Sequence, residues 1–258
     1  MIEVHNLTFG YSATEDGQIL KGVDFAAKTG KLTALIGTNG AGKSTLLKTI
    51  MGILKGKGEI SVNGKPVSQY STKDFSSTVS YLSQDNDCKV NLSVFEVVML
   101  GRMGSMSFRV SDEDIAATQE VLERLNLQRF ASRSIMELSG GQRQLVFMAQ
   151  ALVKEPKILI LDEPTSALDL YKQFDLLTLL KNLTQENDFT TLVTLHHLDL
   201  AAMFADEIIV LKEGTVYAQG APKDIFTEAM MEDVYRVRTK IYIDDNGLPH
   251  VIPLEAIK

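Results

Sequence analysis

The stretch Gly37-Thr38-Asn39-Gly40-Ala41-Gly42-Lys43-Ser44 lies between a strand-like run, Leu32–Ile36, and a helical pattern, Ser44–Met51. It fits G-x-x-x-x-G-K-[ST] at every fixed position, in the strand–loop–helix context that this pattern requires. Its glycines let successive backbone N–H groups turn toward phosphate oxygens, and the helix N-terminus adds partial positive charge. Lys43 supplies a full charge for the β- and γ-phosphates, and the Ser44 hydroxyl is a ligand for Mg²⁺. The stretch predicts nucleotide binding on an α/β fold; the alternative is a glycine-rich turn without a ligand.

The sequence around this loop predicts one α/β domain over residues 1–258, with a helical subdomain at about 93–153 and a C-terminal extension at about 221–258. Ser111-Asp112-Glu113-Asp114 resembles a capping box that starts a helix running to about Leu125. After this insert, strand and helix patterns alternate, which is typical of a mainly parallel sheet with helices on both faces. The tail from Thr239 predicts a hairpin with Asn246-Gly247 as its turn. The expected strands cover 2–11, 18–28, 32–36, 59–63, 81–84, 157–161, 190–195 and 207–212, and further helices cover 141–153 and 170–185.

A second motif, Ile158-Leu159-Ile160-Leu161-Asp162-Glu163, places two carboxylates after a short apolar strand. In open α/β sheets, ligands bind at the carboxyl ends of the strands. We therefore expect Asp162 to hold Mg²⁺ directly or through water, and Glu163 to orient or deprotonate the attacking water. One acid after a strand is common, but two acids in a chain with a phosphate-binding loop favour a catalytic site.

The segment Leu138-Ser139-Gly140-Gly141-Gln142 precedes a well-patterned helix, so it predicts a second helix N-terminus with exposed N–H groups. A self-contained nucleotide-binding enzyme does not need two such cradles for anions. An ordinary N-cap would explain Ser139 but not the pair of glycines.

Taken together, these motifs resemble the ATP-binding cassette (ABC) ATPase family, and the resemblance covers essentially the whole chain. Leu138–Gln142 is similar to the family's signature motif, and Ser166-Ala167-Leu168-Asp169 is similar to its D-loop. The resemblance implies a P-loop NTPase fold with a mixed sheet core, an N-terminal antiparallel part and an inserted helical subdomain. It also implies hydrolysis of ATP with Mg²⁺. The ATP contacts that it implies are Gly37, Thr38, Asn39, Gly40, Ala41, Gly42, Lys43, Ser44 and Thr45 of one subunit, and Ser139, Gly140, Gly141 and Gln142 of the other.

Three isolated residues gain a role only through this resemblance. Gln84 is similar to the glutamine that touches Mg²⁺ or the attacking water and senses the transmembrane partner. His196 is similar to the histidine that contacts the γ-phosphate, and it is preferred over His197 because it falls at a predicted strand end. Tyr11 is placed where the family has an aromatic ring that stacks on adenine, with Phe9 as the alternative.

The composition is that of an ordinary soluble globular protein, with 45% hydrophobic and 23% charged residues. The formal net charge of −7 argues against a broad basic face for nucleic acid. A single cysteine, Cys88, excludes an internal disulfide and suits a reducing compartment. No apolar run reaches the length of a membrane span, and the N-terminus alternates like a strand rather than a signal peptide. We expect a cytoplasmic protein that docks on the inner face of the membrane through a partner.

The resemblance implies a head-to-tail homodimer with ATP between its subunits, a transmembrane permease, and indirectly an extracytoplasmic substrate-binding protein. The segment Val97–Arg102 and the stretches 133–144 and 195–201 resemble the importers of ferric siderophores, haem and vitamin B12. A ferric siderophore is the favoured cargo because it is the commonest in that group; molybdate, haem and cobalamin remain open. The rival classes are a soluble cassette acting on ribosomes or DNA, and a regulatory subunit without turnover.

Overall fold

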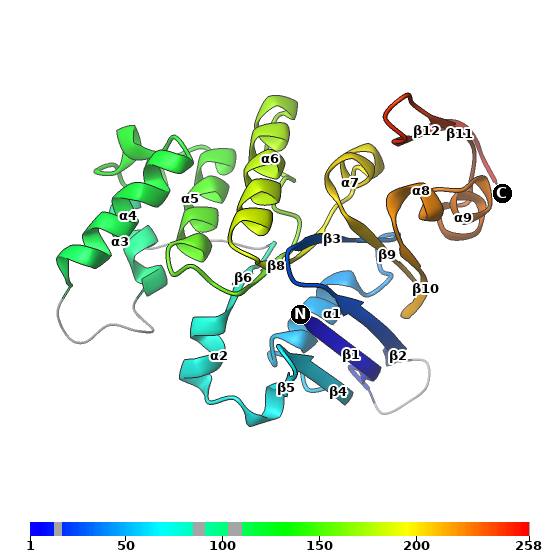
Figure 1. Cartoon of the computed structure of the whole chain (residues 1–258), viewed down its shortest axis with the longest axis horizontal. Helices are drawn as coiled ribbons and strands as arrows, with labels where there is room; N and C mark the ends of the chain where they lie inside the picture. The colour runs from blue at the N-terminus through cyan, green and yellow to red at the C-terminus, as the bar shows by residue number, and fades with distance from the viewer. Residues whose placement is uncertain (13–16, 85–90, 103–109, 258) are drawn as a thin grey trace. The chain divides into compact units, whose positions relative to one another are not determined.

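The computed structural model describes residues 1–12, 17–84, 91–102 and 110–257 (Figure 1). These residues form two compact units, which are described separately: unit 1 comprises 1–69 and 177–258, and unit 2 comprises 70–176. Cys88 lies outside the described residues. None of the helices in the described part of the chain is both long and apolar enough to cross a membrane.

The N-terminal part of unit 1 is an antiparallel sheet. Its strand order is β2-β1-β4-β5. Alternate residues of β1, among them Ile2 and Val4, are fully buried, as the alternating sequence pattern requires. The predicted antiparallel part is therefore confirmed. The strands are β1 (Ile2–Gly10), β2 (Gln18–Ala27), β4 (Lys57–Val62) and β5 (Lys65–Pro66).

The second sheet of unit 1 is mostly parallel, with strand order β10-β9-β3-β8. Strand β3 (Lys31–Ile36) lies between β8 (Thr190–Thr194) and β9 (Glu207–Lys212) and is parallel to both. Strand β10 (Thr215–Gly220) closes the edge as the antiparallel partner of β9. Because β3 is paired on both sides and its residues Leu32–Ile36 are fully buried, the phosphate-binding loop starts from an interior strand of this sheet.

Two helices follow strands of this sheet, and a C-terminal segment comes after its last strand. Helix α1 (Lys43–Ile50) follows β3, and α7 (Leu198–Phe204) connects β8 to β9. After β10 the chain forms α8 (Pro222–Ile225), α9 (Glu228–Met230) and a π-helical turn, η6 (Met231–Tyr235). The predicted hairpin then appears as β11 (Val237–Ile243) and β12 (Pro249–Ala256), which pack against η6, α9 and α7 (Figure 1).

The hairpin differs from its prediction in two respects. It begins at Val237 rather than Thr239, and its turn is longer than an Asn-Gly pair. The carboxylate of Asp244 accepts hydrogen bonds from the backbone N–H groups of Asn246 and Leu248 across the turn. Gly247, which belongs to the predicted turn, has a φ of 79°, a left-handed conformation that glycine adopts readily.

Unit 2 combines two parallel strands with most of the helices of the insert. Strand β6 (Val79–Leu82) pairs with β7 (Ile158–Leu161), so the predicted strand 81–84 is wrong at both ends. The ladder ends at Leu82 and leaves Gln84 in the following loop. Helix α6 (Leu170–Glu186) begins in unit 2 and continues into unit 1. The other helices of unit 2 are α2 (Thr72–Thr78), α3 (Val94–Met99), α4 (Asp112–Arg124) and α5 (Gly140–Leu152), and the short 3-10 turns are η3 (Leu100–Arg102), η4 (Gln128–Phe130) and η5 (Ile135–Glu137).

The capping box of α4 also contains an ion pair between Arg102 and Asp114, called here the Arg102–Asp114 anchor. The Asp114 carboxylate accepts hydrogen bonds from the Ser111 N–H and hydroxyl, and Arg102 Nε donates to its other oxygen at 2.5 Å. The Ser111 hydroxyl, and after it the Arg102 guanidinium, lower the pKa of Asp114 to about 2, compared with an ordinary value of 3.8. Because the pKa is lowered on folding, the ionised carboxylate stabilises the fold above its ordinary pKa. That stabilisation is lost as the pH falls toward about 2.

We predict that Asp114→Asn lowers the melting temperature at neutral pH and makes it less sensitive to acid between pH 3.8 and about 2. Melting curves recorded across this pH range check the prediction. Asp112→Asn is the matched control, since Asp112 is exposed in the same helical turn. If the Asp114 variant keeps the acid sensitivity of the wild type, the Arg102–Asp114 anchor does not contribute as described.

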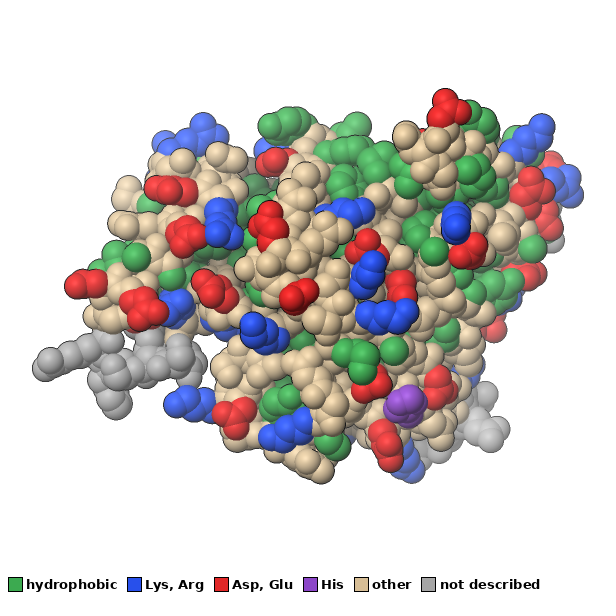
Figure 2. Space-filling model, viewed as in Figure 1, with side chains coloured by type: hydrophobic (Ala, Val, Ile, Leu, Met, Phe, Trp, Pro, Cys, Tyr) green, Lys and Arg blue, Asp and Glu red, His purple; other side chains and the backbone are tan. Residues whose placement is uncertain are grey.

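Charged side chains of both signs are interspersed on the face in Figure 2. Lys and Arg side chains alternate there with Asp and Glu, and no continuous basic area appears among the described residues of that face. This distribution agrees with the net charge of −7.

Candidate functional site

The phosphate-binding loop of unit 1 is held open by its lysine and its glycines. Lys43 is only 7% exposed, and its Nζ donates hydrogen bonds to the carbonyl oxygens of Gly37 at 2.7 Å and Thr38 at 3.0 Å. Gly37, Gly40 and Gly42 have φ angles of 148°, 79° and 103°, which L-residues with side chains rarely adopt. A Cβ on Gly37 would lie 2.2 Å from the Leu211 carbonyl oxygen, so this position excludes any side chain.

The N-terminus of α1 has the properties of a phosphate site. Its N-cap residue, Gly42, has no side chain to cap the first turn, and no acidic residue occurs in that turn. A Cβ on Gly40 would meet nothing within 4 Å, so the space over the loop is open. The positive end of the helix dipole and the Lys43 ammonium therefore meet beside an open cradle, which fits a nucleotide phosphate. Thr38, Ser44 and Thr45 are half-buried, Asn39 is exposed and Ala41 is buried.

His196 follows the strand next to the loop-bearing strand. Strands β3 and β8 are parallel, with Leu35 opposite Thr194, so their carboxyl ends meet at one edge of the sheet. The Leu195 N–H donates to the Leu35 carbonyl oxygen, which extends the pairing to the residue before His196. Both His196 and His197 are exposed. The edge that carries the phosphate-binding loop thus also carries the predicted histidine.

Tyr11 lies just beyond the end of β1 and is 71% exposed. Its ring meets the Phe9 ring edge-on, with centroids 5.0 Å apart. The two candidates for an adenine platform are therefore neighbours, and the structure does not separate them.

The acidic pair of unit 2 lies at the end of β7, as predicted. Asp162 is 2% exposed, and its backbone N–H donates to the Leu82 carbonyl oxygen of the neighbouring strand. Glu163 is half-buried and has a φ of 51°, a left-handed conformation that costs a non-glycine residue on the order of 1–3 kcal/mol. Such strain persists where the surroundings impose it, and it is concentrated at functional sites.

Two glutamines hold Glu163. The Gln84 side-chain amide donates to the Glu163 carboxylate at 2.8 Å. Gln144, on α5, donates to the Glu163 carbonyl oxygen at 3.0 Å, and its own side-chain oxygen accepts from the Ala167 N–H. The structure therefore brings together Gln84 and Glu163 of the predicted site. Sequence reasoning missed Gln144; its only signal is an amide two residues after the signature segment.

The signature segment forms a capped helix start whose two glycines differ. The Ser139 hydroxyl accepts from the Gln142 N–H, and the Gln142 side-chain oxygen accepts from the Ser139 N–H, which is a complete capping box. A Cβ on Gly141 would lie 2.8 Å from the Ala167 carbonyl oxygen, so close packing on the D-loop requires this glycine. A Cβ on Gly140 would meet nothing within 4 Å, and Gly140 is exposed.

Comparison with protein families decides what this arrangement belongs to. A family model described as "ABC transporter" matches residues 20–166, which include the phosphate-binding loop, the signature segment and the acidic pair. The chain belongs to the ABC transporter family. It is an ATP-hydrolysing cassette with the ABC-type P-loop NTPase fold, a mixed sheet with helices.

Relatives and solved structures match the cassette over most of its length. The iron(3+)-hydroxamate import ATP-binding protein of Bacillus subtilis is 37% identical, over 94% of this chain and 90% of its own. The ferric enterobactin transport ATP-binding protein of Escherichia coli is 36% identical, over 96% and 92%. A metal-chelate type ABC transporter in an inward-facing conformation matches with a TM-score of 0.83, 29% identity and coverage of 98% and 97%. A dimeric cassette in a post-hydrolysis state with ADP and phosphate matches with a TM-score of 0.78, 30% identity and coverage of 86% and 98%.

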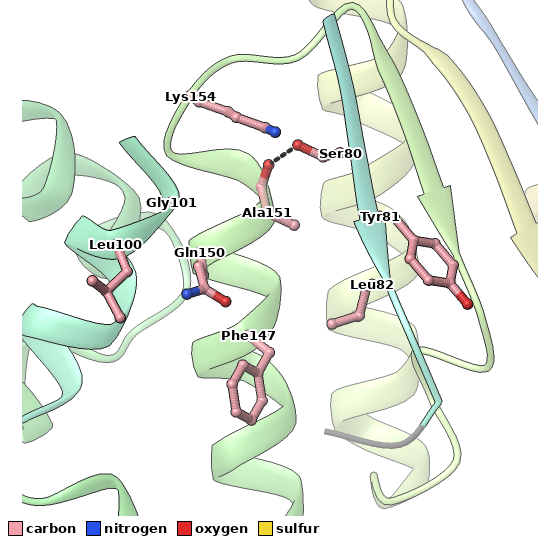
Figure 3. A pocket seen from close by; sticks show the side chains of 9 residues that line it. All are labelled: Ser80, Tyr81, Leu82, Leu100, Gly101, Phe147, Gln150, Ala151 and Lys154. Atoms are coloured by element: carbon pink, nitrogen blue, oxygen red, sulfur yellow. Dashed lines mark hydrogen bonds between the residues drawn. The ribbon is translucent and has the colours of Figure 1, made fainter. Parts of the chain in front are cut away.

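Unit 2 of the cassette also contains a groove between β6 and the C-terminal part of α5, with a volume of about 260 Å³ (Figure 3). The Leu82 side chain points toward α5, and the Ser80 hydroxyl donates to the Ala151 carbonyl oxygen at 2.6 Å (Figure 3). Lys154 donates to the carbonyl oxygens of Ser76 and Val79, and burial lowers the pKa of its ammonium group. Leu100, 42% exposed, borders the groove on the side of η3. Strand β6 lines the groove, and Gln84, which donates a hydrogen bond to Glu163, follows the end of β6 by two residues. The same strand therefore borders the groove and leads to the residue that contacts Glu163.

The oxygen donors of the cassette fit Mg²⁺ in the way that nucleotide enzymes hold it. Among the described residues, no group of three or more His, Cys, Asp or Glu side chains is placed to hold a metal alone. Mg²⁺ in such sites is held by one or two protein oxygens, with phosphate oxygens and water as the remaining ligands. The buried Asp162 carboxylate and the Ser44 hydroxyl at the start of α1 are donors of this kind.

Proposed function

We propose that this cassette drives the import of a metal chelate, specifically a ferric siderophore, through a separate transmembrane permease. The observation that carries the proposal is the agreement of relatives 36–37% identical over 94–96% of the chain, whose names specify ferric hydroxamate and ferric enterobactin. The solved metal-chelate transporter, matched over 98% of the chain, supports the same class of cargo.

The residues of the two units divide the chemistry of hydrolysis between them. Gly37–Thr45 bind the phosphates of ATP, with Lys43 on the β- and γ-phosphates, and Tyr11 or Phe9 stacks on adenine. Ser44, Asp162 and Gln84 would hold Mg²⁺, which would supply positive charge to offset the charge that develops on the phosphates. Glu163 accepts a proton from the attacking water, while Gln84 and Gln144 fix the orientation of Glu163. His196 contacts the γ-phosphate from the edge of the β3–β8 pair.

The signature segment acts on the nucleotide of a second copy of the chain. Gly140 is exposed with open space beside it, and Ser139 and Gln142 begin a helix whose N-terminus favours an anion. A head-to-tail homodimer would supply that anion, and the post-hydrolysis cassette that matches this chain is dimeric. ATP then favours the closed dimer because both subunits contact it, and hydrolysis removes the preference.

The groove between β6 and α5 is the surface on which the permease rests. It lies beside the strand that leads to Gln84, so a helix pressed into it acts on the residue that holds Glu163. This docking places the chain on the cytoplasmic face of the membrane. An extracytoplasmic binding protein would deliver the cargo to the permease, and nucleic acid has no part in this function.

Uptake by cells tests the cargo. Cells that lack this protein should regain uptake of radiolabelled ferric hydroxamate when they receive the wild-type chain, and not when they receive Lys43→Ala. Haem, cobalamin and molybdate serve as competing cargoes in the same cells. Restored uptake of one of these, without ferric hydroxamate, would assign the cassette to that cargo and overturn the siderophore proposal. Recovery of the protein on ribosomes or DNA, and not on membranes, would overturn import altogether.

We predict that Leu100→Glu reduces co-purification with the permease from detergent-solubilised membranes, because a carboxylate at the groove would lose its hydration on docking. The fold should be retained, since Leu100 is 42% exposed. Val110→Glu, at a position 50% exposed outside the groove, is the control and should co-purify as the wild type does. Equal recovery of both variants with the permease would show that docking occurs elsewhere.

A further inference from the structure

Gln144 belongs to the signature helix α5, but its side chain contacts the loop between β7 and α6. The side-chain amide donates a hydrogen bond to the Glu163 carbonyl oxygen at 3.0 Å, and the side-chain oxygen accepts one from the Ala167 N–H at 3.2 Å. Gln144 is half-buried, so water competes little for these bonds. One side chain of α5 therefore spans the loop from Glu163 to the D-loop.

The same face of α5 packs against the D-loop at Gly141. Gly141 precedes Gln144 by three residues, a spacing that places both on one side of the helix. A Cβ on Gly141 would lie 2.8 Å from the Ala167 carbonyl oxygen, and Gln144 binds the Ala167 N–H. The helix start therefore cannot come closer to the D-loop without a clash, and it cannot move away without losing the bonds of Gln144.

The loop between β7 and α6 is also held from α6. Gln173 is only 7% exposed, and its side-chain amide donates to the carbonyl oxygens of Thr165 and Leu168, each at 3.1 Å. Within the loop, the Ser166 hydroxyl donates to the Glu163 carbonyl oxygen at 3.1 Å. Because these polar groups are paired with one another and with α6, the loop resists local deformation. A shift applied at one end of the loop is therefore carried to the other.

Gln144 lies close to the residues that serve the other ATP site. In the proposed head-to-tail dimer, Ser139–Gln142 contact the nucleotide of the partner subunit, whereas Glu163 acts on the nucleotide bound by Lys43 of its own chain. Gln144 follows Gln142 by two residues in the same helix, which is about 3 Å along the helix axis. Over so short a distance a helix moves as a rigid body, so a shift of the signature segment reaches Gln144.

We propose that Gln144 couples the two ATP sites of the dimer. When the signature segment contacts the partner's nucleotide, Gln144 brings Glu163 of its own chain into position for hydrolysis. Gln144 is a positioning residue, because it acts through the backbone of Glu163 and not on the nucleotide. This inference rests on the proposed head-to-tail dimer and goes beyond it, since hydrolysis at each site then depends on occupancy of the other.

The first test is Gln144→Met, which keeps the length of the side chain and removes its donor and its acceptor. In the homodimer, kcat should fall by about threefold to tenfold, the range expected for loss of one neutral hydrogen bond. The KM for ATP and the affinity for ADP should change by less than about twofold, because ground-state binding is untouched. Gln119→Met, at an exposed position of α4, is the matched control and should show wild-type kinetics. A raised KM with wild-type kcat would overturn the proposed role.

Mixed dimers of two differently tagged full-length copies separate coupling from a structural role. One subunit carries Glu163→Gln, so both sites bind ATP but only the other subunit cleaves it. Single-turnover cleavage, which does not depend on dimer opening, is measured. Gln144→Met in the cleaving subunit should slow cleavage by about threefold to tenfold, whereas in the Glu163→Gln subunit it should slow cleavage by less than about twofold. Equal slowing from both placements would show that Gln144 only supports the signature helix, and would overturn coupling.

A second mixed dimer leaves one site empty. Lys43→Ala replaces Glu163→Gln in the non-cleaving subunit, so the signature segment of the cleaving subunit meets no nucleotide. Cleavage should already be slower than in the first dimer, and Gln144→Met in the cleaving subunit should now slow it by less than about twofold. A full effect of Gln144→Met in this dimer would overturn coupling while the proposed function stands. If Lys43→Ala homodimers cleave ATP as the wild type does, the proposed role of the phosphate-binding loop fails, and the inference fails with it.

Discussion

Replacement of Glu163 by glutamine should abolish ATP hydrolysis and leave ATP binding intact. The side chain keeps its length and can still meet Gln84, but an amide cannot accept the proton of the attacking water. General bases contribute about a hundredfold to ten-thousandfold to a rate, so the loss of turnover should be at least about a hundredfold. Because ATP stays bound and uncleaved, the variant should accumulate as an ATP-stabilised dimer. Phosphate release and size-exclusion chromatography with and without ATP measure the two effects.

Glu155→Gln is the matched control for this variant. Glu155 is also a glutamate of unit 2 with a left-handed φ, of 50°, but it is exposed in the turn before β7. Its replacement should leave turnover unchanged. Survival of turnover in Glu163→Gln would show that another group activates the water. Loss of ATP binding in that variant would show instead that Glu163 is needed to form the site.

Replacement of Ser139 by arginine should inactivate the ATP site of the opposite subunit. The arginine removes the N-cap and inserts a bulky side chain where the signature helix should meet the partner's nucleotide. Mixed dimers distinguish the arrangements. With Ser139→Arg in one subunit and Lys43→Ala in the other, both changes fall on one site and the second site stays intact. With both changes in a single subunit, each site loses one component. Occluded ATP should therefore persist at one site in the first dimer and be absent from the second.

Ser139→Ala separates the loss of the cap from the insertion of the arginine. It removes the same hydroxyl at a cost of about 1 kcal/mol in helix stability, without added bulk or charge. Its mixed dimers should retain occluded ATP in both arrangements. A head-to-tail dimer is excluded if the doubly substituted subunit retains ATP beside a wild-type partner while the separated changes abolish it.

The phosphate-binding loop and the acidic pair could be predicted from the sequence because each consists of consecutive residues with a recognisable pattern. The strand before Gly37, the glycines with positive φ and the helix at Lys43 all appear in the structure as expected. The acidic pair after Ile158–Leu161 also lies at a strand end, since an apolar run predicts a buried strand and acids cannot continue it. The roles assigned to these residues stay predictions.

The remainder depended on contacts between distant residues. The end of β6 at Leu82, and not at Gln84, is set by where pairing with β7 stops, which local propensity does not encode. Helix α2 escaped notice because Thr72–Thr78 has a single large apolar residue, Phe75, and no helical periodicity; its N-cap at Ser71 was the only signal. Gln144 belongs to no recognised pattern, and its contact with Glu163 appears only in three dimensions. The single-domain organisation and the limits of the helical subdomain stay predictions.

The two glycines of the signature segment are adjacent in sequence, but they are needed for different reasons. Gly141 is needed for the signature helix to pack closely on the D-loop, because a methyl group there would press on the Ala167 carbonyl and destabilise the fold. Gly140 meets no such obstacle within its own chain. A mutational survey scored on abundance or thermal stability would therefore mark Gly141 as intolerant and pass over Gly140. Only a survey scored on growth that depends on the assembled transporter would recover both, and the difference between the two surveys would map the residues that serve assembly alone.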